Sequence, residues 1–468
     1  MRIHWHRDDL RATDNVGLSA ADEHDDGVLP VFVFDDAVLE HGSPPRVAFM
    51  LDALAELREW YRERGGDLHI AHGDPSSVLP GLASEHEADA VHYNAGYSGL
   101  ARERDRAVTA ALEDAGVAVR EHEDALHHEP GSILTNDGEP YSVYTYFWKK
   151  WRDREKERPY DPPEDIARVP GDELPTLADL GFDAPVADVE PAGMAAARER
   201  LDAFVDGPIY EYAEARDDPA AGATARLSAH FRWGTIGPRT VYAATERAAE
   251  SAPDEAAAES VEEFQGQLAW REFYHHVLHF NPEVVTANYR EYEEGIEWRD
   301  DAEEIAAWKA GETGYPIVDA GMRQLRAEGF MHNRVRMIVA SFLTKDLMVD
   351  WRHGYAHFRE QLVDHNTAND NGGWQWAAST GTDAQPYFRI FNPMTQGERY
   401  DPDAEYITTY VPELDGVSAE EIHSWHELSA EERGELAPDY PDPIVDHGER
   451  REAALAMFQR ARGEEPDE

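Results

Sequence analysis

The first 125 residues alternate short β-rich apolar runs with segments whose apolar positions follow helical spacing. Between two of the runs, helical spacing from Val47 to Tyr61 ends at the glycine pair 65–66. Alternation of this kind predicts a parallel sheet covered by helices on both faces. No strand is followed by GxGxxG or GxxxxGK[ST], so neither phosphate-loop signature is present. The strands are predicted at Arg2–His6, Leu29–Phe34, Leu68–His72, Ala90–Tyr93 and Val117–Arg120.

The pattern changes twice further along the chain. Nine prolines interrupt residues 126–205, which predicts a linker packed over the surface, with one short helix around Tyr144–Glu155. Helical periodicity then continues nearly throughout 206–462. We therefore predict an α/β domain at 1–125, a linker at 126–205, an all-α domain at 206–462 and an acidic tail at 463–468.

Composition restricts the functions that this fold could serve. The 43 basic residues, of which only five are Lys, face 95 acidic ones, and the net charge of −52 is typical of a halophile. Such a charge argues against nucleic-acid binding unless a local basic patch breaks it. The absence of cysteine excludes disulfides, thiolate metal sites and a cysteine nucleophile. With no signal-like segment or apolar run of about 18 residues, we expect a cytoplasmic protein without a membrane span.

One local run does break the acidic trend. Residues 320–345 contain five bases and a single acid, Glu328. The bases could pair individually with carboxylates of other helices. As a group, they favour a wall that faces an anion such as a phosphate. The five are Arg323, Arg326, Arg334, Arg336 and Lys345.

A second concentration of candidate chemistry follows at residues 371–383. Adjacent glycines there allow a close backbone approach, and Trp374 and Trp376 point to different sides of a helix. One ring could face a cofactor and the other a cavity, although a single tryptophan is more often part of a core. The chain also contains pairs of histidines, but none has a third ligand in its pattern, so we predict no metal site.

These segments resemble the photolyase/cryptochrome flavoprotein family, and specifically bacterial-type (class I) cyclobutane pyrimidine dimer photolyases. The similarity runs in order over nearly the whole chain. It implies an N-terminal α/β antenna domain, a long linker and a helical domain that binds FAD. The matching segments are His6–Asn15, Pro140–Trp148, Thr224–Ser228, Trp270–Tyr274, Thr313–Arg323, Met331–Met337, Ala340–Asp346 and Asn371–Asp383.

The resemblance also implies which residues bind FAD. Backbone amides and hydroxyls of the phosphate-binding turn suit an anion. An Arg336–Asp364 pair over the flavin would favour its anionic reduced form. The implied FAD-binding residues are Tyr212, Thr224, Ala225, Arg226, Leu227, Ser228, Phe264, Gln267, Arg336, Asp364, Asn366 and Asp370.

The same resemblance implies a pocket for a flipped pyrimidine dimer and a path for electrons. Flat apolar walls suit unstacked bases. Contacts to the lesion or its phosphates fall on Arg216, Gln267, Trp270, Arg271, Asn333, Arg334, Met337, Trp376 and Arg389. Photoreduction of oxidised FAD would use Trp374, Trp351 and Trp298.

The chain departs from the family pattern at four places. Asp370 stands at the flavin N5 position where photolyases usually carry Asn, as in plant cryptochromes, and Asn366 stands where a second Asp is usual. Gln267 replaces the acid that binds the dimer. Leu100 and Ala101 replace a folate-holding pair.

The antenna is therefore expected to be of the deazaflavin type rather than folate. Arg46 and Arg232 stand where deazaflavin-type enzymes carry basic residues, although Gly96 replaces their Asp.

The resemblance implies a monomeric, light-dependent lyase that repairs cyclobutane pyrimidine dimers in UV-damaged DNA. The alternative is a cryptochrome-type blue-light receptor without repair activity, which Asp370 favours. A third possibility is repair of (6-4) lesions, but Asn333 stands where those enzymes carry a catalytic His.

Overall fold

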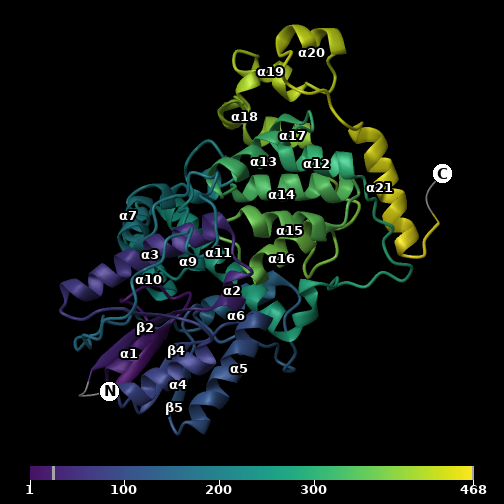
Figure 1. The fold of residues 1–468 in the computed structure, drawn as a ribbon. Coiled ribbons are helices and arrows are strands. Elements are labelled where there is room, and N and C mark those ends of the chain that lie inside the picture. Colours follow the sequence, from purple (N-terminus) through teal and green to yellow (C-terminus); the bar gives the residue numbers. More distant parts are fainter. Residues whose placement is uncertain (24–26, 466–468) are drawn as a thin grey trace.

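A computed structural model describes residues 1–23 and 27–465 and confirms the predicted fold class. The N-terminal domain contains a parallel sheet in the order β3-β2-β1-β4-β5 (Figure 1). Each predicted strand is present, with ends shifted by at most two residues. The strands are β1 Arg2–His6, β2 Val28–Phe34, β3 His69–His72, β4 Ala90–Asn94 and β5 Ala118–His122.

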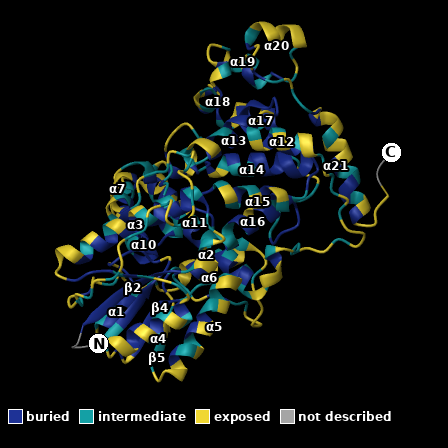
Figure 2. Ribbon diagram, in the orientation of Figure 1, coloured by how far each residue is buried: buried dark blue, intermediate teal, exposed yellow. Residues whose placement is uncertain are grey.

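Helices cover both faces of this sheet because the strand side chains are apolar on both sides. One face packs Phe32 and Phe34 against α3 (Pro44–Glu63), and the other packs Val31 and Val33 against α4 and α5. The central strands are accordingly buried, while exposed residues lie on the outer sides of the helices (Figure 2). The remaining helices of this domain are α1 Val16–Asp22, α2 Asp36–Leu39, α4 Pro75–Glu85 and α5 Gly99–Asp114.

The proline-rich linker contains two helices where the sequence predicted one. The first, α6 (Tyr144–Asp153), confirms the prediction near residue 144. The second, α7 (Gly193–Val205), was not predicted and buries Ala197, Leu201 and Phe204 against the helical domain. Its apolar positions at i, i+4 and i+7 follow helical spacing, which the preceding prolines obscured.

The helical domain is built around the 26-residue α11 and the packed group α12–α16 (Figure 1). Its helices are α8 Tyr212–Ala215, α9 Ser228–Arg232, α10 Pro238–Glu250, α11 Glu255–Phe280, α12 Ala302–Ala310, α13 Pro316–Glu328, α14 Asn333–Ser341, α15 Trp351–Gln361, α16 Thr367–Ala377, α17 Pro393–Tyr400, α18 Glu405–Tyr410, α19 Ala419–His423, α20 Ala430–Leu436 and α21 His447–Ala461. Short 3-10 turns lie at 208–210, 282–285 and 412–414, and a π-helical turn at 342–346.

The N-terminal motif 6–15 joins the two domains through buried ion pairs. Arg239 of α10 bonds Asp14 at 2.6 Å and Asp124 at 2.5 Å, and Arg11 bonds Asp124 at 2.5 Å. All four side chains are almost fully buried. Since every charge has a partner, this network fixes the N-terminal domain against the helical domain.

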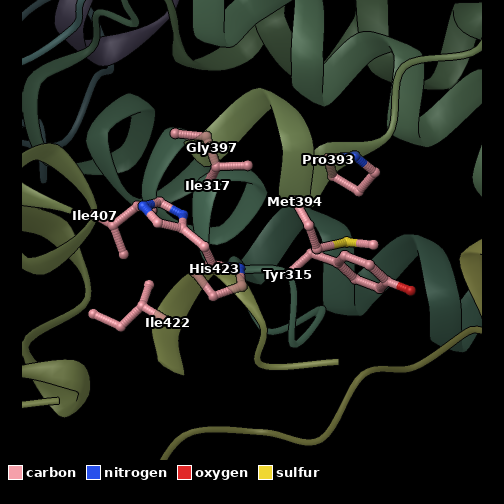
Figure 3. A pocket seen from close by; sticks show the side chains of 9 residues that line it. Tyr315, Ile317, Pro393, Met394, Gly397, Ile407, Ile422 and His423 are labelled. Atoms are coloured by element: carbon pink, nitrogen blue, oxygen red, sulfur yellow. The ribbon is translucent and has the colours of Figure 1, made fainter. Parts of the chain in front are cut away.

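Figure 3 shows a narrow crevice among α13, α17, α18 and α19, lined by Ile317, Met394, Ile407 and Ile422. Its volume is about 10 Å³, enough for about one water molecule, so it is a packing gap and not a cofactor site. Among the helices that the structure describes, none is long and apolar enough to cross a membrane.

Candidate functional site

Arg336 of α14 lies at the centre of a buried polar cluster between α14 and the segment that enters α16. Its guanidinium bonds Asp364 at 2.7 Å, and a second nitrogen lies 3.9 Å from Asp370. Burial alone would lower the pKa of Arg336, but the carboxylates of Asp364 and Asp370 raise it above its ordinary value. Arg336 thus keeps its positive charge inside the helical domain.

The residues that enter α16 are held by their own side chains. Asn366 is the N-cap, and its Oδ1 accepts hydrogen bonds from the amides of Ala368 and Asn369. The Asn366 side-chain nitrogen lies 3.5 Å from Nε2 of His275 on α11. Asp370 follows in the first turn, where the helix dipole favours a negative charge.

The residues of this cluster fit a flavin ring. Asp364 uses Oδ2 for Arg336, while its buried Oδ1 has no partner within the described protein. A buried acceptor without a partner is costly, and a ring N–H is a donor that would satisfy it.

The turn at residues 224–228 fits the phosphates of such a cofactor. Arg226 adopts a left-handed backbone conformation with φ of 47°, and Ala225 and Leu227 are buried on either side. The turn thereby leaves Thr224 half-buried and Ser228 exposed, so that their hydroxyls remain accessible. The predicted phosphate-binding residues are therefore arranged suitably, although Arg226 itself pairs with Glu328 at 2.7 Å.

Two aromatic rings support this turn from below. Tyr212 and Phe264 meet edge to face, 5.3 Å between ring centres, and both are buried. They belong to the same core as Ala225 and Leu227. The predicted contacts at 212, 225, 227 and 264 are thus brought together, with the two rings as the floor of the turn.

Four of the residues predicted to contact a lesion lie on α14, α11 and α16. Asn333 and Met337 are one turn apart on α14, 3.9 Å between Nδ2 and Sδ, and neither is fully buried. Trp270 of α11 is half-buried, and so is Trp376 of α16, whose ring centre lies 6.4 Å from that of Phe391. These groups offer flat apolar surfaces with one amide beside them.

Trp270 is supported by a residue that sequence reasoning missed. Tyr144 at the start of α6 stacks on it with ring centres 3.7 Å apart and planes within 10°. The same end of α6 is tied to the loop after α16, because Asp383 accepts from the Tyr144 amide and Thr382 donates to the carbonyl of Ser142. Tyr144 lies inside the matching segment 140–148, and only its aromatic character was available as a signal.

A further group at this surface lies on α11 and α8. Gln267 donates to Glu263 one turn earlier, 3.4 Å between Nε2 and Oε1, and Arg216 pairs with Glu263 at 2.5 Å. Gln267 stands at the position where the resemblance implies an acid that binds the dimer. Glu263 presents a carboxylate one helical turn before it.

Several predicted contacts are engaged elsewhere. Arg271 donates to the carbonyl of Ala125 and lies over Phe231, so it joins the two domains and does not face the residues around Trp270. Arg334 pairs with Asp217 at 2.6 Å and lies over the ring of Tyr400. Arg389 is exposed on the loop after α16.

The two predicted antenna residues also have protein partners. Arg46 donates to the carbonyls of Arg359 and Leu362 at the end of α15, and it is buried. Arg232 lies over Trp233 and pairs with Asp8 at 3.3 Å. Neither lines the cavity of about 550 Å³ beside α2 and β3.

The basic run 320–345 is not a single wall facing an anion, and this expectation was wrong. Arg323 pairs with Glu413 at 2.6 Å, and Lys345 is buried against Ser379 and the ring of Phe458. Helical periodicity distributes these bases over different faces of α13 and α14, so partners on several elements satisfy them. Of these five bases, Arg336 belongs to the cluster with Asp364, Arg334 pairs with Asp217, and Arg326 is exposed.

The three predicted electron-transfer tryptophans lie in or against one core. Trp374 and Trp351 are buried, and Trp298 packs against their cluster. Trp374 lies directly over Gly354, one turn from Trp351 on α15, where a Cβ would be only 2.0 Å from its ring. The glycine therefore allows the ring of Trp374 to approach α15.

His365 is the second residue that sequence reasoning missed. Its Nδ1 lies 2.6 Å from Oδ2 of Asp370, and both side chains are buried. Its place between Asp364 and Asn366, two residues assigned to FAD, was the available signal.

Comparisons with known proteins agree with this geometry. A family profile described as the FAD binding domain of DNA photolyase matches residues 264–460, and one described as DNA photolyase matches 2–165. The deoxyribodipyrimidine photo-lyase of Halobacterium salinarum is 62% identical, over 99% of this chain and 100% of its own.

Two solved structures share the fold. The class III photolyase of Agrobacterium tumefaciens superimposes with a TM-score of 0.91 at 39% identity, covering 99% of this chain and 98% of its own. The photolyase of Sulfolobus tokodaii, described as containing two FAD molecules, has a TM-score of 0.84 at 32% identity over 98% and 99% of the two chains. This chain therefore belongs to the DNA photolyase family and contains its FAD-binding domain.

Proposed function

We propose that this protein is a light-dependent lyase that splits cyclobutane pyrimidine dimers in UV-damaged DNA. One observation carries the proposal: α14 joins a buried polar cluster to an aromatic surface. Arg336 belongs to the cluster with Asp364, while Asn333 and Met337 on the same helix remain accessible beside the aromatic groups. A cofactor bound at the Arg336–Asp364 cluster and a nucleobase bound at the aromatic surface would therefore lie on either side of α14.

FAD supplies the light-excited electron that opens the cyclobutane ring and takes it back afterwards. The chain's residues hold the reactants. The turn 224–228 binds the phosphates, and Arg336 with Asp364 fixes the flavin ring and offsets its negative charge. Trp270, held by Tyr144, and Trp376 form flat walls for two unstacked bases. Asn333 and Gln267 provide amide hydrogen bonds to the lesion, and Glu263 adds a carboxylate beside Gln267.

Photoreduction uses the core tryptophans. Trp374, Trp351 and Trp298 belong to or pack against one cluster, which suits stepwise electron transfer toward the flavin. We assign the first position next to the flavin to Trp374, because it lies on α16 with Asp370.

The relatives favour repair over a receptor function, since those at 36–62% identity over nearly the full chain are deoxyribodipyrimidine photo-lyases. For the antenna we propose a deazaflavin-type or other flavin-like chromophore. The second FAD of the Sulfolobus tokodaii photolyase supports a tricyclic antenna in this fold. Arg46 is buried against α15, whereas the side chain of Arg232 is 25% exposed, so we assign a direct contact to that chromophore to Arg232.

The experiment compares two lesions under blue light in multi-molar salt. Oligonucleotides that carry one cyclobutane dimer or one (6-4) lesion are incubated with protein whose flavin has been reduced. We expect loss of the cyclobutane dimer alone. Repair of the (6-4) lesion alone, or of neither by protein that retains its flavin, would contradict the proposal.

A further inference from the structure

A buried histidine–carboxylate pair lies beside the proposed flavin position. His365 precedes α16 and Asp370 lies in its first turn, with 2.6 Å between Nδ1 and Oδ2. The two side chains are 10% and 8% exposed. A hydrogen bond this short in a site with so little water has one of two forms. Either His365 donates to the carboxylate, or a protonated Asp370 donates to His365.

The surroundings favour donation by His365. Oδ2 of Asp370 also accepts from the backbone amide of Asn366 at 3.2 Å, and Oδ1 lies 3.9 Å from the guanidinium of Arg336. The start of α16 adds the positive end of a helix dipole. All three features favour a deprotonated carboxyl group at Asp370 that accepts hydrogen bonds. The shared proton therefore belongs on Nδ1 of His365.

Burial, more than the neighbouring charges, favours a neutral ring at His365. Burial lowers the pKa of His365, and Arg46 and Arg232 lower it further, while the bond and charge of Asp370 oppose this. Tyr355 of α15 packs edge-on against the ring, 5.7 Å between centres. The net result is a pKa below 6.5, so the pair carries only its one shared proton at neutral pH.

We propose that His365 is a positioning residue that holds Asp370 as a hydrogen-bond acceptor, so that Asp370 has no proton of its own to give to a reduced flavin. This inference rests on the proposed binding of FAD beside Asp370. When His365 takes up a solvent proton on Nε2, its Nδ1 proton can move to Asp370 and from there to the ring, which leaves a neutral His365 protonated on Nε2. Exchange with solvent, in which Nε2 releases one proton and Nδ1 takes one up, then restores the starting tautomer. One proton passes from solvent to the ring and no electron is moved by the pair. Protonation of the reduced ring therefore depends on pH through His365.

The first test measures the tautomer of His365 in the wild-type protein. The full-length protein, labelled with ¹⁵N-histidine and kept in the dark as purified, is studied by two-bond ¹H–¹⁵N NMR at pH 7.5, and H365N identifies the signal. We expect a protonated Nδ1. A protonated Nε2 with a bare Nδ1 would overturn the proposal, because Asp370 would then be the donor. This readout does not depend on repair, so a failure of the proposed function leaves it intact.

The second test follows the long-wavelength absorbance of the protonated one-electron-reduced flavin during blue illumination with an external reductant, from pH 5 to 9. Because the pKa of His365 is lowered, this absorbance in wild type should rise only as the pH falls below 6.5 and should be absent at pH 8. H365N keeps an amide donor for Asp370 but cannot titrate, so its profile should be flat or displaced by at least one pH unit. D370N should show no absorbance of this kind at any pH. A wild-type profile reproduced by H365N would overturn the proposal.

Discussion

Gly354 makes room for the ring of Trp374, the first position of the proposed photoreduction path. A Cβ at this position would lie 2.0 Å from Trp374, which is 2% exposed and cannot move aside. We expect Gly354→Ala to lower the free energy of unfolding by about 1–3 kcal/mol, as overpacking of a core does. Chemical denaturation at constant salt measures it.

Gly373 offers the matched control. It lies on α16 beside Trp374 and is exposed, and a methyl group added to its Cα would meet no atom within 4 Å. Gly373→Ala should therefore leave stability unchanged or raise it slightly, because alanine favours a helix more than glycine does. Equal losses of unfolding free energy in both variants would show that replacing a helical glycine, and not the contact with Trp374, causes the effect.

Trp374 and Trp376 lie two residues apart on α16 and should separate two activities. Trp374→Phe should abolish photoreduction of oxidised FAD while chemically reduced protein still repairs. Trp376→Ala should leave photoreduction near normal and weaken dimer binding by about 1–3 kcal/mol, the scale of base stacking on an aromatic ring. Flavin absorbance under blue light and binding to a dimer-containing oligonucleotide measure the two effects. If both variants lose both activities equally, the rings serve only to support the fold.

For individual residues, the sequence predicted which side chains are buried or charged at the site better than it predicted which groups they contact. Arg336 with Asp364 and the buried position of Trp374 agree with expectation. His365 and Tyr144 were missed because their roles come from contacts with Asp370 and Trp270, which lie outside any spacing rule. Arg271 was assigned to the lesion, yet its guanidinium reaches Ala125 in the other direction.

Among the elements, α6 carries an unusual share of positive charge. Lys149 and Lys150 are exposed on it, Lys156 follows shortly after, and the whole chain has only five lysines. Tyr146, 59% exposed, lies on the same helix, whose first residue stacks on Trp270. This arrangement suits a strand of nucleic acid that runs past the proposed lesion-binding surface around Trp270.

Replacing Lys149 and Lys150 together by Glu should weaken binding to dimer-containing duplex by on the order of tenfold or more, since phosphate contacts carry much of such affinity. Lys309→Glu, an exposed lysine on α12, is the control for a change of charge alone. Titration of a labelled duplex at fixed salt compares them. An equal loss for α6 and α12 variants would mean that only net charge matters.

The elements themselves were largely predictable. All five strands and the helical character of 206–462 follow from periodicity, because both faces of the sheet and the helical core bury apolar side chains. The linker helix α7 escaped because prolines dominate the segment before it. The basic run failed as a single surface because α13 and α14 direct their bases to different partners, such as Glu413 and Asp217.

At the scale of the whole molecule, buried histidines should lower the free energy of unfolding as the solution becomes acidic. Burial lowers the pKa of eight histidines to about 3 or 4, so they stay neutral in the folded protein while the unfolded chain takes up protons below pH 6.5. Three buried acids act in the opposite direction, since burial raises the pKa of Glu272 to about 7 and of Asp319 and Asp346 to about 6. The histidines are His4, His92, His128, His230, His275, His276, His332 and His357.

Because the histidines outnumber these acids, the unfolded state binds more protons and stability should fall as pH drops from 6.5 toward 4. Denaturant unfolding at pH 7.5, 6.5 and 5.5 in constant multi-molar salt measures this. Stability that is constant or rises toward pH 5.5 would show that the buried acids dominate.

The net charge of −52 should invert the usual salt dependence of DNA binding at low salt. The acidic field repels DNA unless it is screened, so affinity should fall as salt is lowered, opposite to ordinary counterion release. Binding to a dimer-containing duplex from 0.1 to 3 M salt, with the fold monitored by circular dichroism, tests this expectation. A steady gain in affinity for DNA as salt is lowered, with the fold intact, would contradict this expectation.

Light-dependent repair is tested most directly by counting the dimers that each protein molecule splits in light and in darkness. Protein with reduced flavin is incubated with excess thymine-dimer oligonucleotide in multi-molar salt, and restored thymines are measured by chromatography. We expect many turnovers under blue light, none in the dark, and no stoichiometric consumption of reductant, because the electron returns to the flavin. Absence of restored thymines in the light, with flavin bound and DNA binding demonstrated, would contradict light-dependent repair.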